Sequence, residues 1–91
     1  MNVELVNKLG DCRSRRSFVK TSSAALGEPN TELLSYFLRK HDRHLIHKLI
    51  LDTMVIELHG GMLTKDQSRK RTPGGILAVL IRNKKPLYVY F

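Results

Sequence analysis

The stretch from Asp42 to Gly60 constrains the fold most strongly. Asp42 belongs to the residue types that cap helix starts, and Gly60 is the residue type that ends helices in the left-handed conformation. The apolar residues between them recur at helical spacing and form one stripe: Leu45, Ile46, Leu49, Ile50, Thr53, Met54 and Ile56 or Leu58. The pattern predicts a helix over residues 43–58.

Two further segments have helical patterns with start signals. Over residues 31–40, Asn30 or Thr31 can cap a helix whose apolar positions are Leu33, Leu34, Phe37 and Leu38. Over residues 73–83, Thr72 is a good cap and Pro73 fits the first helical position, where its missing N–H costs nothing. The apolar residues of this last segment are Ile76, Leu77, Val79, Leu80 and Ile81, and it ends near Asn83.

The sequence therefore predicts a mainly α-helical fold, a small bundle in which three core helices enclose one core. Val3, Leu5, Val6 and Leu9 add a short N-terminal helix that ends at Gly10. Residues 61–68 alternate loosely, so we expect a turn or short hairpin before the last helix.

We divide the chain into an N-terminal segment 1–23, a helical domain 24–83 and a tail 84–91. Residues 11–23 are polar, basic and serine-rich, so we interpret this part as flexible. Phe18 and Val19 could anchor it or extend a helix. The tail ends in the apolar residues 87–91. These residues could form a strand, could dock on a partner, or could be apolar only because the chain is truncated there. Pro86 prevents the last helix from continuing through it.

Length and charge narrow the classes of function. A chain of 91 residues makes one domain at most, and its formal net charge is +8. A small domain this basic usually has a polyanionic partner such as RNA, DNA or an anionic membrane surface. Most of the charge follows residue 60, where Asp66 is the one acidic residue among Lys65, Arg69, Lys70, Arg71, Arg82, Lys84 and Lys85.

Three cations stand directly before the start of the last helix. Arg69, Lys70 and Arg71 precede Thr72 and Pro73, and Gly74 and Gly75 carry no side chains that would shield the first-turn N–H groups. An anion can approach such a helix start closely and is attracted by the positive end of the helix dipole. The arrangement predicts a phosphate-binding strip, with contacts from Arg69, Lys70, Arg71, Thr72, Gly74 and Gly75. The alternative is an ordinary turn beside a solvated charged face.

Other cations are open to two interpretations. Lys65 and Arg82 could extend the phosphate-binding strip or serve solubility alone. Arg39, Lys40 and Arg43 cluster at the junction of the first two core helices, where solvated charge is the simpler explanation and a second patch is the alternative.

Catalytic and metal sites lack support in the sequence. Cys12 is the single cysteine, which excludes an intramolecular disulfide and a cysteine-rich zinc site. His41, His44 and His47 lie on one helix start, but the further ligands that a structural zinc needs are not evident. No nucleophile has a base at a recognisable spacing. We predict no cofactor, no metal, no enzymatic activity and no membrane partner, and we expect a soluble, intracellular monomer.

Residues 26–83 resemble the RNA-binding domain of the family of the phosphorylated adaptor for RNA export, PHAX. The matching motifs are Leu26-Gly27-Glu28-Pro29 with Leu33-Leu34, then His59-Gly60-Gly61-Met62-Leu63, and then Ser68 to Ile76 followed by Leu80 and Asn83. The chain departs from the family where Leu63 replaces an aromatic residue and where Lys65-Asp66-Gln67 replaces a Gly or Asn turn. Arginine side chains, which can also stack on unpaired bases, partly compensate for the missing aromatic.

The resemblance implies a small helical domain that binds single-stranded RNA with little sequence preference. It also implies a role in the nuclear export of small nuclear RNAs, with a nuclear location and shuttling to the cytoplasm. Family members bind export-complex proteins through separate segments for which this chain has no room, so we interpret it as a fragment, an isolated module or a shortened relative.

Two other classes of function are possible on the residues alone. A protein-interaction module would dock an acidic partner through the basic face or the apolar tail. DNA binding is disfavoured, because no helix carries base-reading Arg or Asn along one exposed face. A phosphate group on Ser68 or Thr72 would repel RNA from the strip.

Overall fold

The computed structural model describes residues 1–83 and residue 89. Most of these residues lie in helices. In chain order they are α1 (Val3–Asn7), a short 3-10 turn η1 (Leu9–Asp11), α2 (Arg15–Leu26), α3 (Thr31–Lys40), α4 (Arg43–Leu58) and α5 (Pro73–Asn83). The mainly helical fold and the helices predicted over 31–40, 43–58 and 73–83 are confirmed. The expectations for the tail lie outside the described residues, Val89 excepted.

Side-chain caps mark the starts of α1, α2 and α3, whereas Asp42, at the cap position of α4, makes no capping hydrogen bond. The side chain of Asn2 accepts a hydrogen bond from the backbone N–H of Leu5 at 3.1 Å, and Ser14 and Asn30 do the same for α2 and α3. These bonds satisfy N–H groups that have no partner inside the helix. At its other end α2 stops at Gly27, which has a φ of 69° that residues with a Cβ adopt only with strain.

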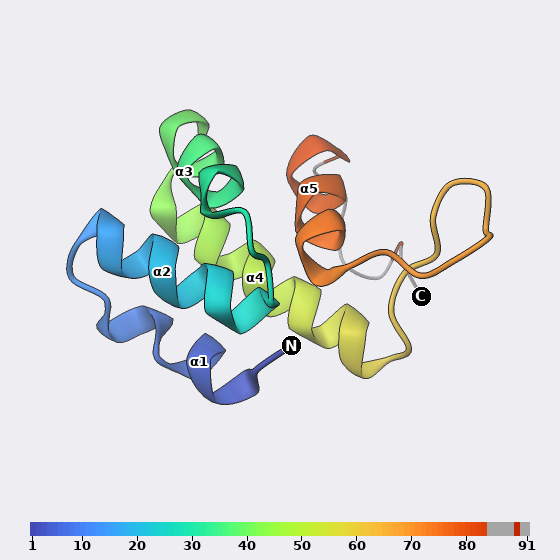
Figure 1. Ribbon diagram of the computed structural model, residues 1–91, viewed down its shortest axis with the longest axis horizontal. Helices are drawn as coiled ribbons and strands as arrows, with labels where there is room; N and C mark the ends of the chain where they lie inside the picture. Colours follow the sequence, from blue (N-terminus) through green and yellow to red (C-terminus); the bar gives the residue numbers. More distant parts are fainter. Residues whose placement is uncertain (84–88, 90–91) are drawn as a thin grey trace.

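The long helix α4 contacts α1, α3 and α5, and α2 contacts α1 and α3. Figure 1 shows α1, α2 and α3 grouped toward one end of the molecule, with α5 and the loop before it toward the other. The hydrophobic core lies between them and draws on all five helices: Val6, Leu9, Phe18, Val19, Ala25, Leu26, Leu34, Phe37, Leu38, Ile46, Leu49, Ile50, Ile56, Ile76, Leu77, Leu80 and Ile81.

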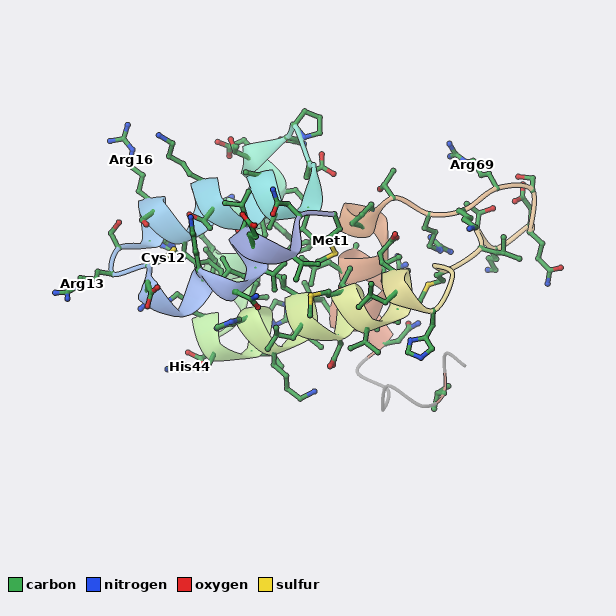
Figure 2. All side chains as sticks on the ribbon, turned by 90° about the horizontal axis from the view of Figure 1, so that it is seen from below. Met1, Cys12, Arg13, Arg16, His44 and Arg69 are labelled. Carbon is green, nitrogen blue, oxygen red and sulfur yellow. The ribbon has the colours of Figure 1, made fainter. Side chains whose placement is uncertain are left out.

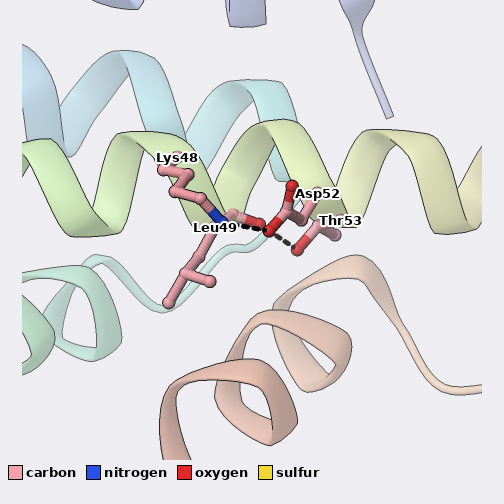
Figure 3. A network of polar contacts seen from close by, with 4 residues as sticks. All are labelled: Lys48, Leu49, Asp52 and Thr53. Atoms are coloured by element: carbon pink, nitrogen blue, oxygen red, sulfur yellow. Dashed lines mark hydrogen bonds and ion pairs between the residues drawn. The ribbon is translucent and has the colours of Figure 1, made fainter. Parts of the chain in front are cut away.

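Helix α4 combines a buried face with a solvated one. Thr53 is fully buried, and its hydroxyl donates to the Leu49 carbonyl oxygen at 2.8 Å, which removes the cost of burying it. One residue earlier, Asp52 pairs with the exposed Lys48 ammonium at 3.1 Å (Figure 3). A surface pair of this kind contributes little to stability. The packing of the buried face therefore holds α4 in place.

The structure corrects the interpretation of residues 11–23. Instead of a flexible segment, this stretch contains most of α2, and the helix crosses the boundary expected between residues 23 and 24. Phe18, Val19, Ala25 and Leu26 bury their side chains in the core. The physical reason is burial, because the ring of Phe18, which is 1% exposed, can leave water only if the surrounding backbone is ordered.

Candidate nucleic-acid interface

Residues 61–72 form a loop that projects away from the helices, and we call it the basic loop (Figure 1). Two glycines with positive φ, Gly60 at 106° and Gly61 at 86°, turn the chain at the end of α4. The N–H of Gly61 donates to the Ile56 carbonyl oxygen at 2.9 Å, which satisfies one of the last carbonyls of the helix. The loop therefore starts from a fixed point on α4.

The two arms of the basic loop pair as a minimal hairpin. Leu63 and Lys70 form an isolated antiparallel bridge. Next to it, the N–H of Thr64 donates to the Arg69 carbonyl oxygen at 2.8 Å, and the N–H of Arg71 donates to the Met62 carbonyl oxygen at 2.6 Å. The turn or short hairpin predicted before the last helix is thus present, and it brings the three cations next to the chain that leaves α4.

Asp66 organises the turn between the arms. Its carboxylate accepts hydrogen bonds from the Thr64 hydroxyl at 2.6 Å and from the N–H and hydroxyl of Ser68 at 3.1 and 2.8 Å. These bonds, that from Thr64 above all, lower the pKa of Asp66 from 3.8 to about 2, because they stabilise the charged form. Gln67 has a φ of 62°, which completes the reversal of the chain.

The cations of the basic loop differ in their surroundings. Arg69 and Lys70 are exposed, and so is Lys65 near the turn. Arg71 is half-buried, and its Nε donates to the Leu63 carbonyl oxygen at 3.2 Å, so it also holds the loop in shape. A cavity of about 160 Å³ lies beside these side chains, and the described residues that line it are Thr64, Arg69, Lys70, Arg71, Thr72 and Gly75. None of these residues is acidic.

The start of α5 closes one side of this cavity. The hydroxyl of Thr72 accepts a hydrogen bond from the N–H of Gly75 at 3.1 Å, so Thr72 caps the helix as predicted. Gly75 lines the cavity, whereas Gly74 is buried on another side of the helix start. A Cβ built on Gly74 would lie 2.5 Å from Oε2 of Glu28. The two glycines therefore have different surroundings.

The structure brings together most of the predicted site residues. Arg69, Lys70, Arg71, Thr72 and Gly75 line one cavity, and Lys65 lies on the same loop. Arg82 lies in the last turn of α5, about 15 Å along the helix from Thr72, and lines a different cavity.

Two residues near the two ends of α5 were not assigned to the site from the sequence. Glu28 reaches the start of α5 from the α2–α3 connection. Tyr36 lies in the same cavity as Arg82 and is 49% exposed. For Tyr36 a signal existed, since it precedes Phe37 in the apolar pattern of α3 and falls outside the buried face. Glu28 belongs to the Leu26-Gly27-Glu28-Pro29 motif, but its position beside Gly74 could not be predicted because the two residues are distant in the sequence.

The histidines show no sign of a metal centre. Over residues 1–83 and residue 89, no group of three or more His, Cys, Asp or Glu side chains is arranged to hold a metal ion. The ring of His47 instead meets the edge of Phe18, with 6.2 Å between the ring centroids. Within the same part of the chain, no helix has the length and apolar character needed to cross a membrane.

Comparison with known protein families shows to which family the chain belongs. The profile of the family described as "Phosphorylated adapter RNA export protein, RNA-binding domain" matches residues 18–88. The chain belongs to this family. The match begins within α2, at the buried Phe18, and covers the basic loop and the whole of α5. The family resemblance seen in the sequence is confirmed.

Individual members of the family are moderately similar to the chain. The proteins named "Phosphorylated adapter RNA export protein" from Bos taurus and Homo sapiens are each 33% identical to it over 61 residues, which is 67% of this chain and 16% of each relative. The Mus musculus protein of the same name is 33% identical over 58 residues, or 64% of this chain and 15% of its own length. The chain thus spans a small part of these relatives. No solved structure matches it significantly.

Proposed function

We propose that this chain binds RNA as a single strand, with little sequence preference, through the basic loop and the start of α5. The observation that carries the proposal is the cavity beside the basic loop. Its described lining contains Arg69, Lys70 and Arg71, the Thr72 hydroxyl and the side-chain-free Gly75, and no acidic group. Such a site favours a phosphate group, because cations and the positive end of a helix act on the same point.

Each residue has a defined part in this proposal. Arg69 and Lys70 are exposed and bind phosphates of the strand directly, and Lys65 extends the positive surface. Arg71 binds a phosphate while its Nε keeps the hydrogen bond to the Leu63 carbonyl oxygen. Thr72 and Gly75 line the cavity at the helix start, and Gly75 has no side chain that would block a phosphate there. We assign Gly74 to packing against Glu28, because it is buried and faces away from the cavity.

The preference for a single strand follows from the surface around the cavity. Leu63 is 51% exposed on the basic loop, where it pairs with Lys70, and offers an apolar contact for an unpaired base. Guanidinium groups stack on bases of any type, so contacts of this kind are tolerant of sequence. In a duplex the base faces are stacked on one another and cannot stack on a protein side chain. The same loop therefore gains less from double-stranded RNA.

The wider role is proposed from the names of the relatives, which describe RNA export adapters. We propose that the RNA is a small nuclear RNA and that the module works in an adaptor for its nuclear export, in the nucleus with shuttling to the cytoplasm. Export-complex proteins would then bind segments of the relatives that lie outside the matched region. We propose that the domain itself acts as a monomeric binding module, with no enzymatic step.

The test is fluorescence anisotropy with an unstructured RNA oligonucleotide and the matching RNA duplex. We expect tighter binding of the single strand. Replacing Arg69→Ala and Lys70→Ala together should lower the affinity for the single strand, by about tenfold for each phosphate that no longer has its cation. Arg71 is kept in this variant because its side chain also supports the loop.

A matched control is available at the other end of the molecule. Arg13→Ala and Arg16→Ala together remove the same charge from exposed positions far from the basic loop (Figure 2). This variant should bind the RNA within about twofold of the native chain, since only long-range attraction changes. Equal losses in the two variants would overturn the proposed site. Equal binding of polyglutamate and RNA by the native chain would favour the protein-interaction alternative.

A further inference from the structure

A second cavity lies between α3 and α5, at the end of α5 that is remote from the basic loop. Its volume is about 690 Å³, and its described lining includes Tyr36 and Lys40 from α3 and Ala78, Ile81 and Arg82 from α5. Figure 1 shows α3 and α5 on the same side of α4. We call it the α3–α5 groove.

Tyr36 presents a large aromatic surface to this groove. It is 49% exposed, although its neighbours Phe37 and Leu38 are buried. The ring meets that of Phe37 edge-on, with 6.0 Å between centroids and 62° between planes, so a core residue supports its orientation. An aromatic ring that rests against a core residue and is half exposed is suited to stacking on a planar ligand.

Two cations, Lys40 and Arg82, line the groove together with Tyr36. The Lys40 ammonium lies 5.9 Å from the centroid of the Tyr36 ring, and both Lys40 and Arg82 are exposed. No acidic side chain belongs to the described lining of the groove. A ligand that fits must therefore combine negative charge with a flat, stackable group. Nucleotides in a single strand have this combination, and aromatic platforms within positive grooves are how many proteins bind them.

The groove and the basic loop are connected along one face of α5. Gly75 lines the cavity at the basic loop, whereas Ala78 and Arg82 line the α3–α5 groove. Spacings of three and four residues place these three positions on the same side of a helix. Gly75 and Arg82 are separated by about 10 Å along the axis. Because Gly75 and Ala78 are small, this face of α5 leaves room for an RNA strand to pass along it.

We propose that the α3–α5 groove is a second contact for the RNA strand held by the basic loop. In it an unpaired base stacks on Tyr36, and Lys40 and Arg82 bind the flanking phosphates. Lys40 is exposed, so its ammonium can move from the ring to a phosphate when the base arrives. The inference rests on the proposed function and adds to it a base-stacking residue and the path of the strand. Arg82 then belongs to the RNA site through the groove.

The test separates base stacking from attraction to phosphate by using two probes. One is a 12-nucleotide oligouridine, and the other is a ribose-phosphate strand of the same length without bases. Tyr36→Ala should weaken oligouridine binding by about 5- to 100-fold, as expected when one base no longer stacks on an aromatic ring, and should leave the abasic strand unaffected. Tyr36→Phe keeps the ring and should bind oligouridine like the native chain. Arg82→Ala should weaken the binding of both probes.

The outcomes distinguish the groove from the proposed function as a whole. If Tyr36→Ala binds oligouridine as the native chain does while Arg69→Ala/Lys70→Ala does not, the groove contact is wrong and the basic loop stands. If Tyr36→Ala weakens both probes equally, stacking is wrong. If the native chain binds neither probe, the proposed function and the groove fail together. Thermal melting of each variant confirms that it is folded, which is expected because Tyr36 lies outside the core cluster.

Discussion

At the scale of single residues, the start of α5 combines an open side and a side occupied by the protein itself. Gly75 faces the cavity with Thr72 and the three cations, and Gly74 faces the Glu28 carboxylate. Glu28 also accepts a hydrogen bond from the N–H of Asn30 at 3.1 Å, which keeps it at the helix start. A carboxylate near a helix N-terminus is stabilising, but its charge also opposes the approach of a phosphate.

Replacing Glu28 by Gln should therefore strengthen RNA binding. The change removes one negative charge beside the helix start while it keeps the shape of the side chain. We expect the affinity for single-stranded RNA to rise by about two- to fivefold, the equivalent of 0.3–1 kcal/mol. Glu4→Gln, on the exposed surface of α1, is the control with the same change in net charge. Equal effects of the two substitutions, measured by anisotropy, would contradict a local role for Glu28.

The second prediction at this scale concerns Asp66. Because its folded pKa of about 2 lies below the ordinary value of 3.8, its contribution to loop stability is fully present above pH 3.8 and is lost as the pH falls toward 2. Titration of the Asp66 carboxyl carbon by NMR should give a midpoint near 2. Thr64→Val removes the hydrogen bond that lowers this pKa most and should move the midpoint upward. A native midpoint near 3.8 would contradict the turn geometry.

At the scale of elements, α3, α4 and α5 could be predicted and α2 could not, although Ser14 caps the start of α2 and Gly27 ends it. Asn30, Asp42 and Thr72 mark the starts of α3, α4 and α5, and all three helices have their predicted bounds. In α2, the buried stripe includes Ser22, whose hydroxyl donates to the Phe18 carbonyl oxygen at 2.7 Å. Because serine is a polar residue type, its presence at a buried position makes the sequence of this core helix look like that of a polar, exposed segment.

If α2 is a core element, truncating Phe18 must unfold more than a local segment. Phe18→Ala should lower the free energy of unfolding by about 3–5 kcal/mol, the usual cost of removing a buried aromatic ring. Urea denaturation followed by circular dichroism measures this loss. Arg16→Ala, exposed on the same helix, should stay within about 0.5 kcal/mol of the native chain. A Phe18→Ala variant of native stability would restore the interpretation of a flexible segment.

In the candidate site, the features that are local in the sequence could be predicted, and those that depend on tertiary packing could not. The cations at 69–71 and the cap at Thr72 are contiguous in sequence, so the strip could be predicted. The packing of Glu28 against Gly74 and the groove between Tyr36 and Arg82 join residues that are roughly 45 positions apart. Whether such distant residues become neighbours depends on how the helices pack, and the periodicity of the sequence contains no information about that packing. The hydrogen bond from Arg71 Nε to the Leu63 carbonyl oxygen depends on the register of the hairpin, which the loose alternation of residues 61–68 does not define.

At the scale of the whole molecule, exposed arginines lie at both ends of an elongated body. The molecule measures 37 × 25 × 23 Å, and Figure 2 shows Arg69 at one end of the long axis and Arg13 and Arg16 at the other. The net charge of +8 attracts a polyanion from a distance, at a rate that falls with salt. Long-range attraction alone does not choose between the ends. The other end also has a helix start and a cavity, whose lining includes Arg15 and Arg16. We assign the bound strand to the basic loop because the loop and the start of α5 lie within the region matched by the family profile, whereas Arg15 and Arg16 precede it.

The salt dependence of binding tests this assignment most directly. The affinity for one unstructured RNA oligonucleotide is measured at several salt concentrations for the native chain, for Arg69→Ala/Lys70→Ala and for Arg13→Ala/Arg16→Ala. Each phosphate neutralised contributes about 0.7 to the slope of log affinity against log salt, so the first variant should have a slope shallower by about 1.4. The second variant should keep the native slope. A native slope in the first variant, or the same reduction in both, would contradict binding at the basic loop.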